Sequence, residues 1–302
     1  MMPTSAVPPG ACGKIPEAIR PEPMSPLRPT SARSQAADVW KLGKGEFEDL
    51  VATEEPLEIR LEGRALAVTL RTPGDDEELA AGFVLTEGLV KHAGDIERIV
   101  VVDDVAPSAR GNVVDVRLVK TAGRSRSTSA SKLTHRPSFI TSACGVCGRG
   151  TIDAISRRAA PLPDGGSVAS SRVVAFPDRL RLAQAVFAET GGLHAAGLFD
   201  FAGNLLVARE DVGRHNAVDK VVGCGALRGQ LPFSDTALLV SGRAGFEIIL
   251  KAWIAGIPIV ASVSAPSHLA VQLAEEANMT LIGFLRGGSF TVYHGRHRIE
   301  SG

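Results

Sequence analysis

Short apolar segments alternate with longer helical segments along residues 168–302, and this alternation constrains the fold more than any other feature of the sequence. The apolar segments have strand length and are bounded by Gly, Pro, Asn or Asp. We expect strands at residues 193–199, 205–208, 236–240, 257–263, 280–285 and 290–294, and helices at residues 177–189, 217–227, 246–255 and 266–277. Because alternating strands and helices are typical of layered α/β proteins, residues 168–302 are predicted to form an α/β domain with a largely parallel sheet.

A smaller α+β region is predicted over residues 46–158. Residues 57–61 alternate apolar and polar side chains and turn at Glu62 and Gly63 into residues 65–70, as expected of a hairpin. A helix is expected from about Asp76 to Gly88, followed by strands at residues 96–102 and 113–119.

Two segments are expected to lack regular structure. Residues 1–35 are rich in Pro and Ser and show no apolar periodicity, so they are predicted to be a disordered tail. Residues 121–138 are polar and basic and are predicted to be a mobile loop at the end of the smaller region. This loop leads directly to a pair of cysteines.

That pair, Cys144 and Cys147, holds two of only four cysteines in the chain. A Cys-x-x-Cys spacing suits a metal site, a dithiol–disulfide cycle or the passage of a sulfur atom. Structural zinc is disfavoured because the sequence has no second Cys pair and no His pair of suitable spacing. A zinc deaminase would need His-x-Glu and Pro before the first cysteine, and Ala143 stands where that Pro would be.

The residues around Cys144 and Cys147 are compatible with two functions of the thiols. Phe139 and Ile140 could end a strand before the pair, as in a thioredoxin-like dithiol oxidoreductase. Sulfur carriage is favoured because Gly145 and Gly148, behind a long polar loop, would let a carrier cysteine meet both donor and acceptor. Arg149 could stabilise the thiolate.

Small, hydroxyl and basic residues follow three of the predicted strands. They are residues 241–243 (Ser-Gly-Arg), 264–267 (Ser-Ala-Pro-Ser) and 286–289 (Arg-Gly-Gly-Ser). Strand ends of a parallel sheet meet at one edge, where ligands bind, and helix N-termini there favour phosphate. Arg243, Ser264 and Arg286 are therefore predicted to hold a nucleotide or another phosphate ligand.

Residues 210–220 (EDVGRHNAVDK) are dense in reactive side chains. Arg214, His215 and Asp219 could share one helical face, either as functional groups or as structural ones.

The charge balance and the hydropathy of the chain argue against nucleic acid and membranes as binding partners. Lys plus Arg and Asp plus Glu both number 33, so no general affinity for nucleic acid is implied. The longest uncharged apolar stretch, residues 253–263, is too short to span a bilayer and contains Gly256 and Pro258. With no secretory signal and no Cys framework, a cytoplasmic location is expected.

The chain also resembles the formate dehydrogenase accessory sulfurtransferases of the FdhD family, over about residues 46–296. The motifs that carry the resemblance, in order, are residues 55–57, 83–88, 144–148, 190–196, 210–220, 241–243, 264–266, 270–271 and 283–284.

The resemblance implies a function. Such proteins take sulfur as a persulfide from a cysteine desulfurase and pass it to molybdenum in the bis(molybdopterin guanine dinucleotide) cofactor before that cofactor enters formate dehydrogenase. Cys144 would carry the persulfide and Cys147 would assist it. The family's cofactor-binding stretch matches Phe284, Leu285, Arg286, Gly287, Gly288 and Ser289. The cofactor is a bound substrate, and no structural zinc is expected.

The resemblance also implies a cytidine-deaminase-like α/β domain without zinc, and a homodimer. Two alternatives to sulfur transfer stay open: a thioredoxin-like dithiol oxidoreductase, and a cofactor-binding chaperone that transfers no sulfur.

Overall fold

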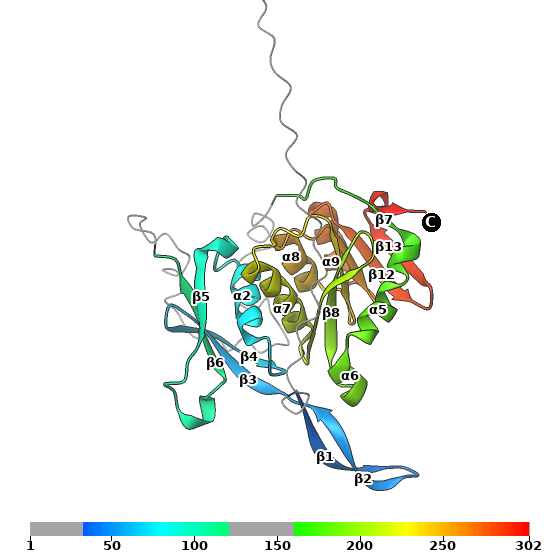
Figure 1. Ribbon diagram of the computed structural model, residues 1–302. Coiled ribbons are helices and arrows are strands. Elements are labelled where there is room, and N and C mark those ends of the chain that lie inside the picture. The colour runs from blue at the N-terminus through cyan, green and yellow to red at the C-terminus, as the bar shows by residue number, and fades with distance from the viewer. Residues whose placement is uncertain (1–32, 121–159, 302) are drawn as a thin grey trace, which may run out of the picture.

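The computed structural model describes residues 33–120 and 160–301 (Figure 1). Cys144, Cys147 and the predicted loop at residues 121–138 lie outside the described residues, as does most of the predicted tail. The described chain forms two sheets of four and six strands, two small two-stranded sheets, and the helices between them.

The larger sheet is the core of the C-terminal half. Its strands are β8 (His194–Asp200), β9 (Leu205–Asp211), β10 (Thr236–Val240), β11 (Ile259–Ser262), β12 (Thr280–Arg286) and β13 (Ser289–His294). Their order across the sheet is β13-β12-β11-β10-β8-β9. Strands β10, β11 and β12 are parallel, but β8, β9 and β13 run antiparallel to their neighbours. The prediction of a largely parallel sheet is therefore wrong, because tight turns after β8 and β12 fold these strands into hairpins.

Helices cover both faces of this sheet (Figure 1). One face packs against α7 (Arg214–Leu227), α8 (Phe246–Ile254) and α9 (His268–Glu276). The other packs against α4 (Ser170–Val173) and α5 (Phe176–Leu182), with α6 (Ala185–Thr190) next to them. Successive residues of β10 alternate between the two cores, Leu238 facing α7–α9 and Leu239 facing α5. Both faces are thus buried, as the apolar strands predict.

The single helix predicted over residues 177–189 is in fact two helices, α5 and α6, separated at Ala183 and Gln184. No Gly or Pro marks this break. The cause lies in β9, where the carboxylate of Glu210 accepts hydrogen bonds from the backbone N–H of Val186 and of Phe187, at 3.1 and 2.8 Å. A distant side chain therefore caps the start of α6, and the sequence of the helix alone gives no signal of it.

The N-terminal half forms a second sheet with one helix. Strands β3 (Glu55–Leu61), β4 (Arg64–Arg71), β5 (Ile96–Val101) and β6 (Val113–Leu118) are ordered β4-β3-β6-β5. Helix α2 (Asp76–Thr86) packs on this sheet. The β3–β4 hairpin, the helix and the two later strands are all where the sequence predicts them.

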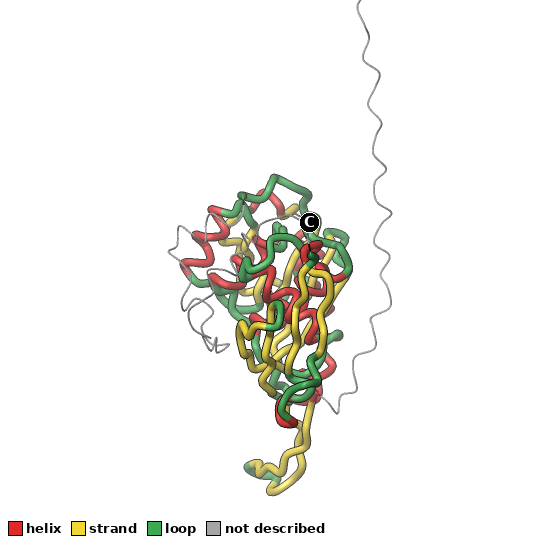
Figure 2. Tube along the Cα trace, turned by 90° about the vertical axis from the view of Figure 1, so that its left-hand side faces the viewer, coloured by secondary structure: helices red, strands yellow, loops and turns green. Residues whose placement is uncertain are grey.

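A hairpin of β1 (Ser34–Lys41) and β2 (Gly45–Ala52) projects from the body of the molecule, as Figures 1 and 2 show. It was not predicted. The last strands, β7 (Val168–Ala169) and β14 (Ile299–Glu300), pair in parallel. Short 3₁₀ helices span Ala93–Asp95, Pro107–Ala109 and Arg296–Arg298.

The two halves meet where α2 crosses α7, and the two backbones touch there. A Cβ atom on Gly82 would overlap the carbonyl oxygen of Asp219, and one on Gly223 would overlap that of Glu78. Only glycine fits at either position, so the halves share one tightly packed interface.

Buried charges reinforce this interface. Lys251 Nζ of α8 lies 2.9 Å from both carboxylate oxygens of Asp219 in α7 and donates to Thr86 Oγ1 of α2 at 2.8 Å. Nearby, the guanidinium of Arg209 donates two hydrogen bonds to the carboxylate of Glu78, at 2.6 and 2.7 Å. Removing one partner of the buried Lys251–Asp219 pair costs about 3–5 kcal/mol, so this pair helps to fix how the halves are placed. The partly exposed Arg209–Glu78 pair adds to the same contact.

We predict that Gly223→Ala destabilises the protein by about 3 kcal/mol, because the added methyl group must push α2 away from α7. Alanine is intrinsically the better helix former by about 1 kcal/mol, so helix propensity alone predicts the opposite sign. Urea unfolding followed by circular dichroism measures the change. Gly94→Ala is the control, because a Cβ atom there meets nothing within 4 Å. Equal stability of the two variants would contradict the backbone contact.

Candidate functional site

The ends of β10, β11 and β12 bring together the three segments that the sequence singles out. Ser241–Arg243 follow β10, Ser264 lies just past β11, and Phe284–Ser289 end β12 and start β13. Residues Ala244 and Pro266 pair as an isolated β-bridge, and the backbone N–H of Phe284 donates to the carbonyl oxygen of Ser264 at 3.1 Å. We call this side of the sheet the strand-end edge.

Three helices begin at the strand-end edge: α7, α8 and α9. Their first backbone N–H groups carry partial positive charge and attract anions. At α9 one of these groups is already used, because the hydroxyl of Ser267 accepts from the N–H of Ala270 at 3.2 Å. The edge as a whole is therefore suited to negatively charged ligands.

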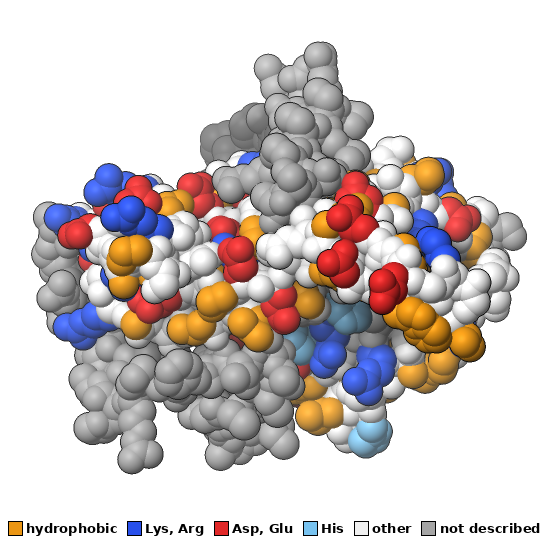
Figure 3. Space-filling model, turned by 90° about the horizontal axis from the view of Figure 1, so that it is seen from below, with side chains coloured by type: hydrophobic (Ala, Val, Ile, Leu, Met, Phe, Trp, Pro, Cys, Tyr) orange, Lys and Arg blue, Asp and Glu red, His pale blue; other side chains and the backbone are white. Residues whose placement is uncertain are grey.

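Arginine side chains strengthen this preference. Arg214, Arg243 and Arg286 have no carboxylate within 4.0 Å among residues 33–120 and 160–301. Arg243 and Arg286 are exposed. Viewed from below, basic and histidine side chains gather on this face (Figure 3). Unpaired arginines beside helix N-termini can bind phosphate oxygens in bidentate fashion.

His194, at the start of β8, lies beside Arg214. A Cβ atom on Gly242 would lie 3.4 Å from its imidazole ring and 3.7 Å from Cδ of Arg214. Burial, and then the charges of Arg214 and His215, lower the pKa of His194. Its imidazole is therefore neutral at pH 7 and available as a hydrogen-bond donor or acceptor.

His215 has a different partner. Its Nε2 lies 2.8 Å from Oε2 of Glu247, at the start of α8, and this contact lowers the pKa of the Glu247 carboxyl. The pair links the first turns of α7 and α8. Asp219, by contrast, is 2 % exposed and bonded to Lys251, so it does not share the partly exposed face of Arg214 and His215.

Asp211 holds the turn that leads into α7. Its carboxylate accepts from the backbone N–H of Thr72 at 3.2 Å and of Gly213 at 2.8 Å, and it lies 2.8 Å from Nζ of Lys220. Both Asp211 and Lys220 are fully buried. The sequence suggests at most a helix cap for Asp211 and no role for Lys220, whereas the N-cap of α7 is Gly213. The pair positions the backbone just before Arg214 and His215, and so orients two side chains of the strand-end edge.

The segment Phe284–Ser289 divides its side chains between core and surface. Leu285 is fully buried, while Phe284 is 37 % exposed and carries the guanidinium of Arg286 at 5.5 Å from its ring centroid. Gly287 and Gly288 have positive φ angles of 59° and 75°, so the turn is bare backbone that a ligand can approach closely.

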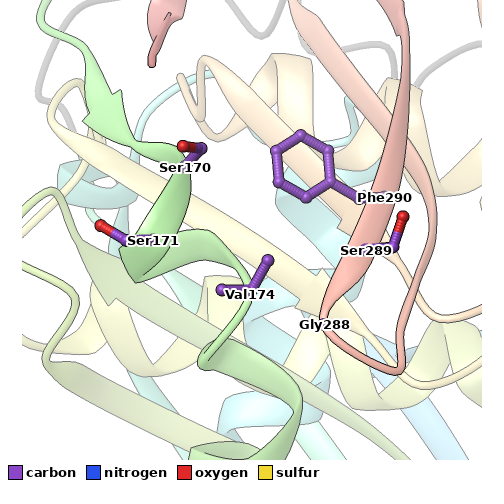
Figure 4. A pocket seen from close by; sticks show the side chains of 6 residues that line it. All are labelled: Ser170, Ser171, Val174, Gly288, Ser289 and Phe290. Carbon is purple, nitrogen blue, oxygen red and sulfur yellow. The ribbon is translucent and has the colours of Figure 1, made fainter. Parts of the chain in front are cut away.

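A cavity of about 380 Å³ adjoins this turn (Figure 4). It lies between α4 and the start of β13. Its lining residues are Ser170, Ser171, Val174, Gly288, Ser289 and Phe290. The predicted cofactor stretch therefore borders a space large enough for part of a small ligand.

Among the described residues, no three His, Cys, Asp or Glu side chains are grouped as metal ligands. No helix in that part of the chain combines the length and the apolar character that a membrane span requires. Cys224 is the one cysteine within it, and burial raises the pKa of its thiol to about 11. Cys224 is thus held as an unreactive thiol, and the structure does not place Cys144 or Cys147 relative to the strand-end edge.

Comparison with known proteins gives a consistent match. The FdhD/NarQ family model matches residues 52–300. The sulfur carrier protein FdhD of Streptomyces avermitilis is 50 % identical over 256 residues, covering 83 % of this chain and 89 % of its own. That of Mycobacterium tuberculosis is 47 % identical over 258 residues, covering 83 % and 92 %.

A solved structure is similar as well. A crystal structure from Desulfotalea psychrophila, provisionally described as a formate dehydrogenase accessory protein, aligns with a TM-score of 0.67 at 28 % identity. The alignment covers 88 % of this chain and 98 % of that one.

We predict that His194 titrates below the ordinary histidine value near 6.5, because burial, and after it the charges of neighbouring basic groups such as Arg214, disfavours its protonated form. The unfolded chain then binds the proton more readily, so this group lowers the stability of the fold as the pH falls through about 6.5. Histidine NMR titration measures the midpoint. Arg214→Gln should raise it and Arg228→Gln, at the far end of α7, should not. A midpoint at or above 6.5 in the unmodified protein would contradict this account.

Proposed function

The chain belongs to the FdhD/NarQ family, and we propose that it is a sulfur carrier required for formate dehydrogenase activity. It would accept sulfur from a cysteine desulfurase and deliver it to the molybdenum of the bis(molybdopterin guanine dinucleotide) cofactor. Family membership supports the sulfur chemistry. The proposed binding of the cofactor is supported by one observation: Arg243, Ser264 and Phe284–Ser289 lie together at an edge that attracts anions.

The proposed first step is a persulfide transfer to Cys144. The Cys144 thiolate attacks the outer sulfur of the desulfurase persulfide, a new S–S bond forms, and the desulfurase cysteine leaves as a thiolate. Electrons balance because one S–S bond replaces another. Arg149, five residues along the chain, would favour the thiolate form.

The second step delivers the outer sulfur to the cofactor. Attack of the Cys147 thiolate on the inner sulfur of the Cys144 persulfide would release that outer sulfur as sulfide and leave a Cys144–Cys147 disulfide. Alternatively, the outer sulfur passes directly to molybdenum, which supplies two electrons, and Cys144 is restored as a thiolate. Cys147 then only supports its neighbour.

The strand-end edge would hold the cofactor during this step. Its guanine dinucleotide ends carry pyrophosphates, which match Arg243, Arg286 and the helix N-termini. The bare turn at Gly287 and Gly288 allows close approach, and Ser264 and Ser289 offer hydroxyl groups. Neutral His194 adds a further hydrogen-bonding group.

The number of residues between Cys144 and Ala160 is large enough for Cys144 to reach the strand-end edge. Ala160 is the first described residue after the cysteines, and its carbonyl accepts from Nε1 of Trp253, near the end of α8 away from the edge, at 2.9 Å. Helix α8 has nine residues and is about 14 Å long. Fifteen residues separate Cys144 from Ala160, and a chain of that length extends to roughly 50 Å.

Three further features belong to this proposal. The six-stranded sheet with helices on both faces would be a zinc-free relative of the cytidine-deaminase fold. The protein would act in the cytoplasm, where thiols stay reduced. It would also form a homodimer.

Sulfur loading is tested by mass spectrometry after incubation with a cysteine desulfurase and free cysteine. We expect the peptide that contains Cys144 to gain the mass of one sulfur atom, because the thiolate is the nucleophile. Cys144→Ala should abolish the adduct, and Cys224→Ala, which removes a buried thiol, should keep it. Absence of sulfur on both Cys144 and Cys147 would refute sulfur carriage. Full maturation of the dehydrogenase by Cys144→Ala would favour the chaperone alternative.

Cofactor binding at the strand-end edge is tested with two arginine variants. Arg243→Ala and Arg286→Ala should each retain about tenfold less molybdenum and guanine nucleotide after purification from a cofactor-producing host, because each loses a charge-assisted contact. Arg228→Ala removes an exposed arginine at the other end of α7 and should retain wild-type amounts. Equal retention in all three variants would place the cofactor elsewhere.

A further inference from the structure

The β1–β2 hairpin projects from the end of the molecule that carries the strand-end edge (Figures 1 and 2). We call this hairpin the arm. Its base adjoins the edge, because a Cβ atom on Gly192, two residues before His194, would lie 3.3 Å from Cβ of Ala52. Each strand has eight residues and is about 27 Å long. The arm therefore extends beyond the surface at which the cofactor is proposed to bind.

The base of the arm is fastened to the body of the molecule, but the rest of the arm has no core. The buried Arg33 donates from Nη2 to the carbonyl oxygen of Glu210 at 3.1 Å, and its own carbonyl accepts from the N–H of Thr53 at 2.9 Å. Beyond this base, none of residues 35–51 is buried. Because a two-stranded hairpin without a covered face is only marginally stable in water, a partner that covers the arm would stabilise it.

The two faces of the arm differ in what covers them. On one face Val39 and Phe47 lie opposite each other and are half-buried, and Nζ of Lys44 lies 3.6 Å from the ring centroid of Phe47. On the other face Trp40 is 66 % exposed, and Leu42 in the turn is 85 % exposed. An exposed tryptophan on a projecting element is a typical anchor of a protein–protein contact.

The face that carries Trp40 is acidic. Asp38 lies directly opposite Glu48, and Glu46 lies directly opposite Trp40. In the part of the chain that the structure describes, none of these three carboxylates has a basic group within 4.0 Å. Like charges directly opposite each other destabilise a pair of strands, and a basic partner would remove that cost. The face therefore suits a protein surface with basic groups around an apolar centre.

Two other occupants fit this face less well. A two-fold contact between the arms of two copies of this chain would place the same carboxylates against one another. An arm laid on the basic strand-end edge of a second copy would cover the residues proposed to hold the cofactor. A cysteine desulfurase has to approach the two cysteines, and the chain that follows them rejoins the described structure at Ala160, near the end of α8 away from the edge.

We propose that the arm docks the protein that receives the cofactor, through the basic surface around the entrance to its cofactor site. This inference rests on the proposed function, under which the receiving protein is a formate dehydrogenase that lacks its cofactor. The cofactor carries pyrophosphates, so a site that admits it is basic. The unpaired arginines of the strand-end edge repel such an entrance, whereas the acidic face of the arm attracts it. Trp40 and Leu42 would anchor the contact and hold the entrance towards the edge.

Biolayer interferometry tests this docking with the full chain, free of cofactor, and the purified cofactor-free catalytic subunit of a formate dehydrogenase from the same organism. We expect the double variants Trp40→Ala with Leu42→Ala, and Glu46→Lys with Glu48→Lys, each to raise the Kd at least tenfold. Binding of the wild-type chain should weaken as salt is added, and the charge-reversed variant should depend less on salt.

The matched control is Glu275→Lys with Glu276→Lys. These two exposed residues end α9 and lie away from the edge, so the variant makes the same change of charge outside the arm. It should bind the dehydrogenase subunit like the wild-type chain. Wild-type affinity in both arm variants, or an equal loss of affinity in the control, would overturn the proposal.

Photocrosslinking gives a second readout that does not depend on a change in affinity. Leu42→p-benzoylphenylalanine should crosslink to the dehydrogenase subunit, and Leu227→p-benzoylphenylalanine, at an exposed position at the end of α7, should not. Crosslinks from position 42 only to a second copy of this chain would assign the arm to a contact between copies and overturn the proposal.

The outcome is separable from that of the proposed function. Both arm variants should still gain one sulfur atom on Cys144 and retain wild-type amounts of cofactor, because neither step involves the arm. Unchanged binding of the dehydrogenase by the arm variants, with normal sulfur loading, refutes the docking role alone. Failure of the wild-type chain to load sulfur, with arm-dependent binding of the dehydrogenase, refutes sulfur carriage alone. Loss of sulfur loading in the arm variants with unchanged dehydrogenase binding would assign the arm to the desulfurase instead.

Discussion

The contact between the backbones of α2 and α7 determines how the rest of the molecule is arranged. Gly82 and Gly223 let each helix press against main-chain atoms of the other. At that distance no side chains can separate the helices, and polar groups near the crossing must be satisfied in place. Lys251, Asp219 and Thr86 satisfy one another across the three helices α2, α7 and α8. The interface is therefore defined by shape and by charge together.

The α2–α7 interface also positions the strand-end edge, although the interface is not part of that edge. Helix α7 runs from the edge into the contact with α2, so fixing its body fixes its first turn. Asp211 and Lys220, both fully buried, bind the backbone before that turn to Thr72 of the N-terminal half. Arg214 and His215 thus depend on residues more than a hundred positions earlier in the chain. The N-terminal half therefore forms its own sheet and also holds Arg214 and His215 of the strand-end edge in position.

Much of this architecture is predictable from the sequence, and the failures have definite physical causes. Strands and helices with their own periodicity, such as Thr236–Val240 and Phe246–Ile254, are found where expected. So are Arg243, Ser264 and Arg286 at one edge, because parallel strands must end together. The break at Gln184 could not be predicted, since its cause is the Glu210 carboxylate of another strand. The antiparallel outer strands and the projecting β1–β2 hairpin depend on tertiary pairing. The buried roles of Asp211 and Lys220 likewise appear only when the N-terminal half is in place.

The acidic and basic residues of the chain balance in number, but they are distributed unevenly in the folded structure. Equal numbers of acidic and basic residues exclude a general attraction to polyanions, yet they do not exclude a local one. Asp211, Asp219 and Glu78 are held by Lys220, Lys251 and Arg209 inside the molecule or at the junction of its halves. These three carboxylates are paired with other basic groups, so they do not neutralise Arg214, Arg243 and Arg286 at the strand-end edge. A neutral protein can therefore present a concentrated positive site. Such a site selects an anionic ligand of matching shape, because little long-range attraction draws other polyanions to the surface.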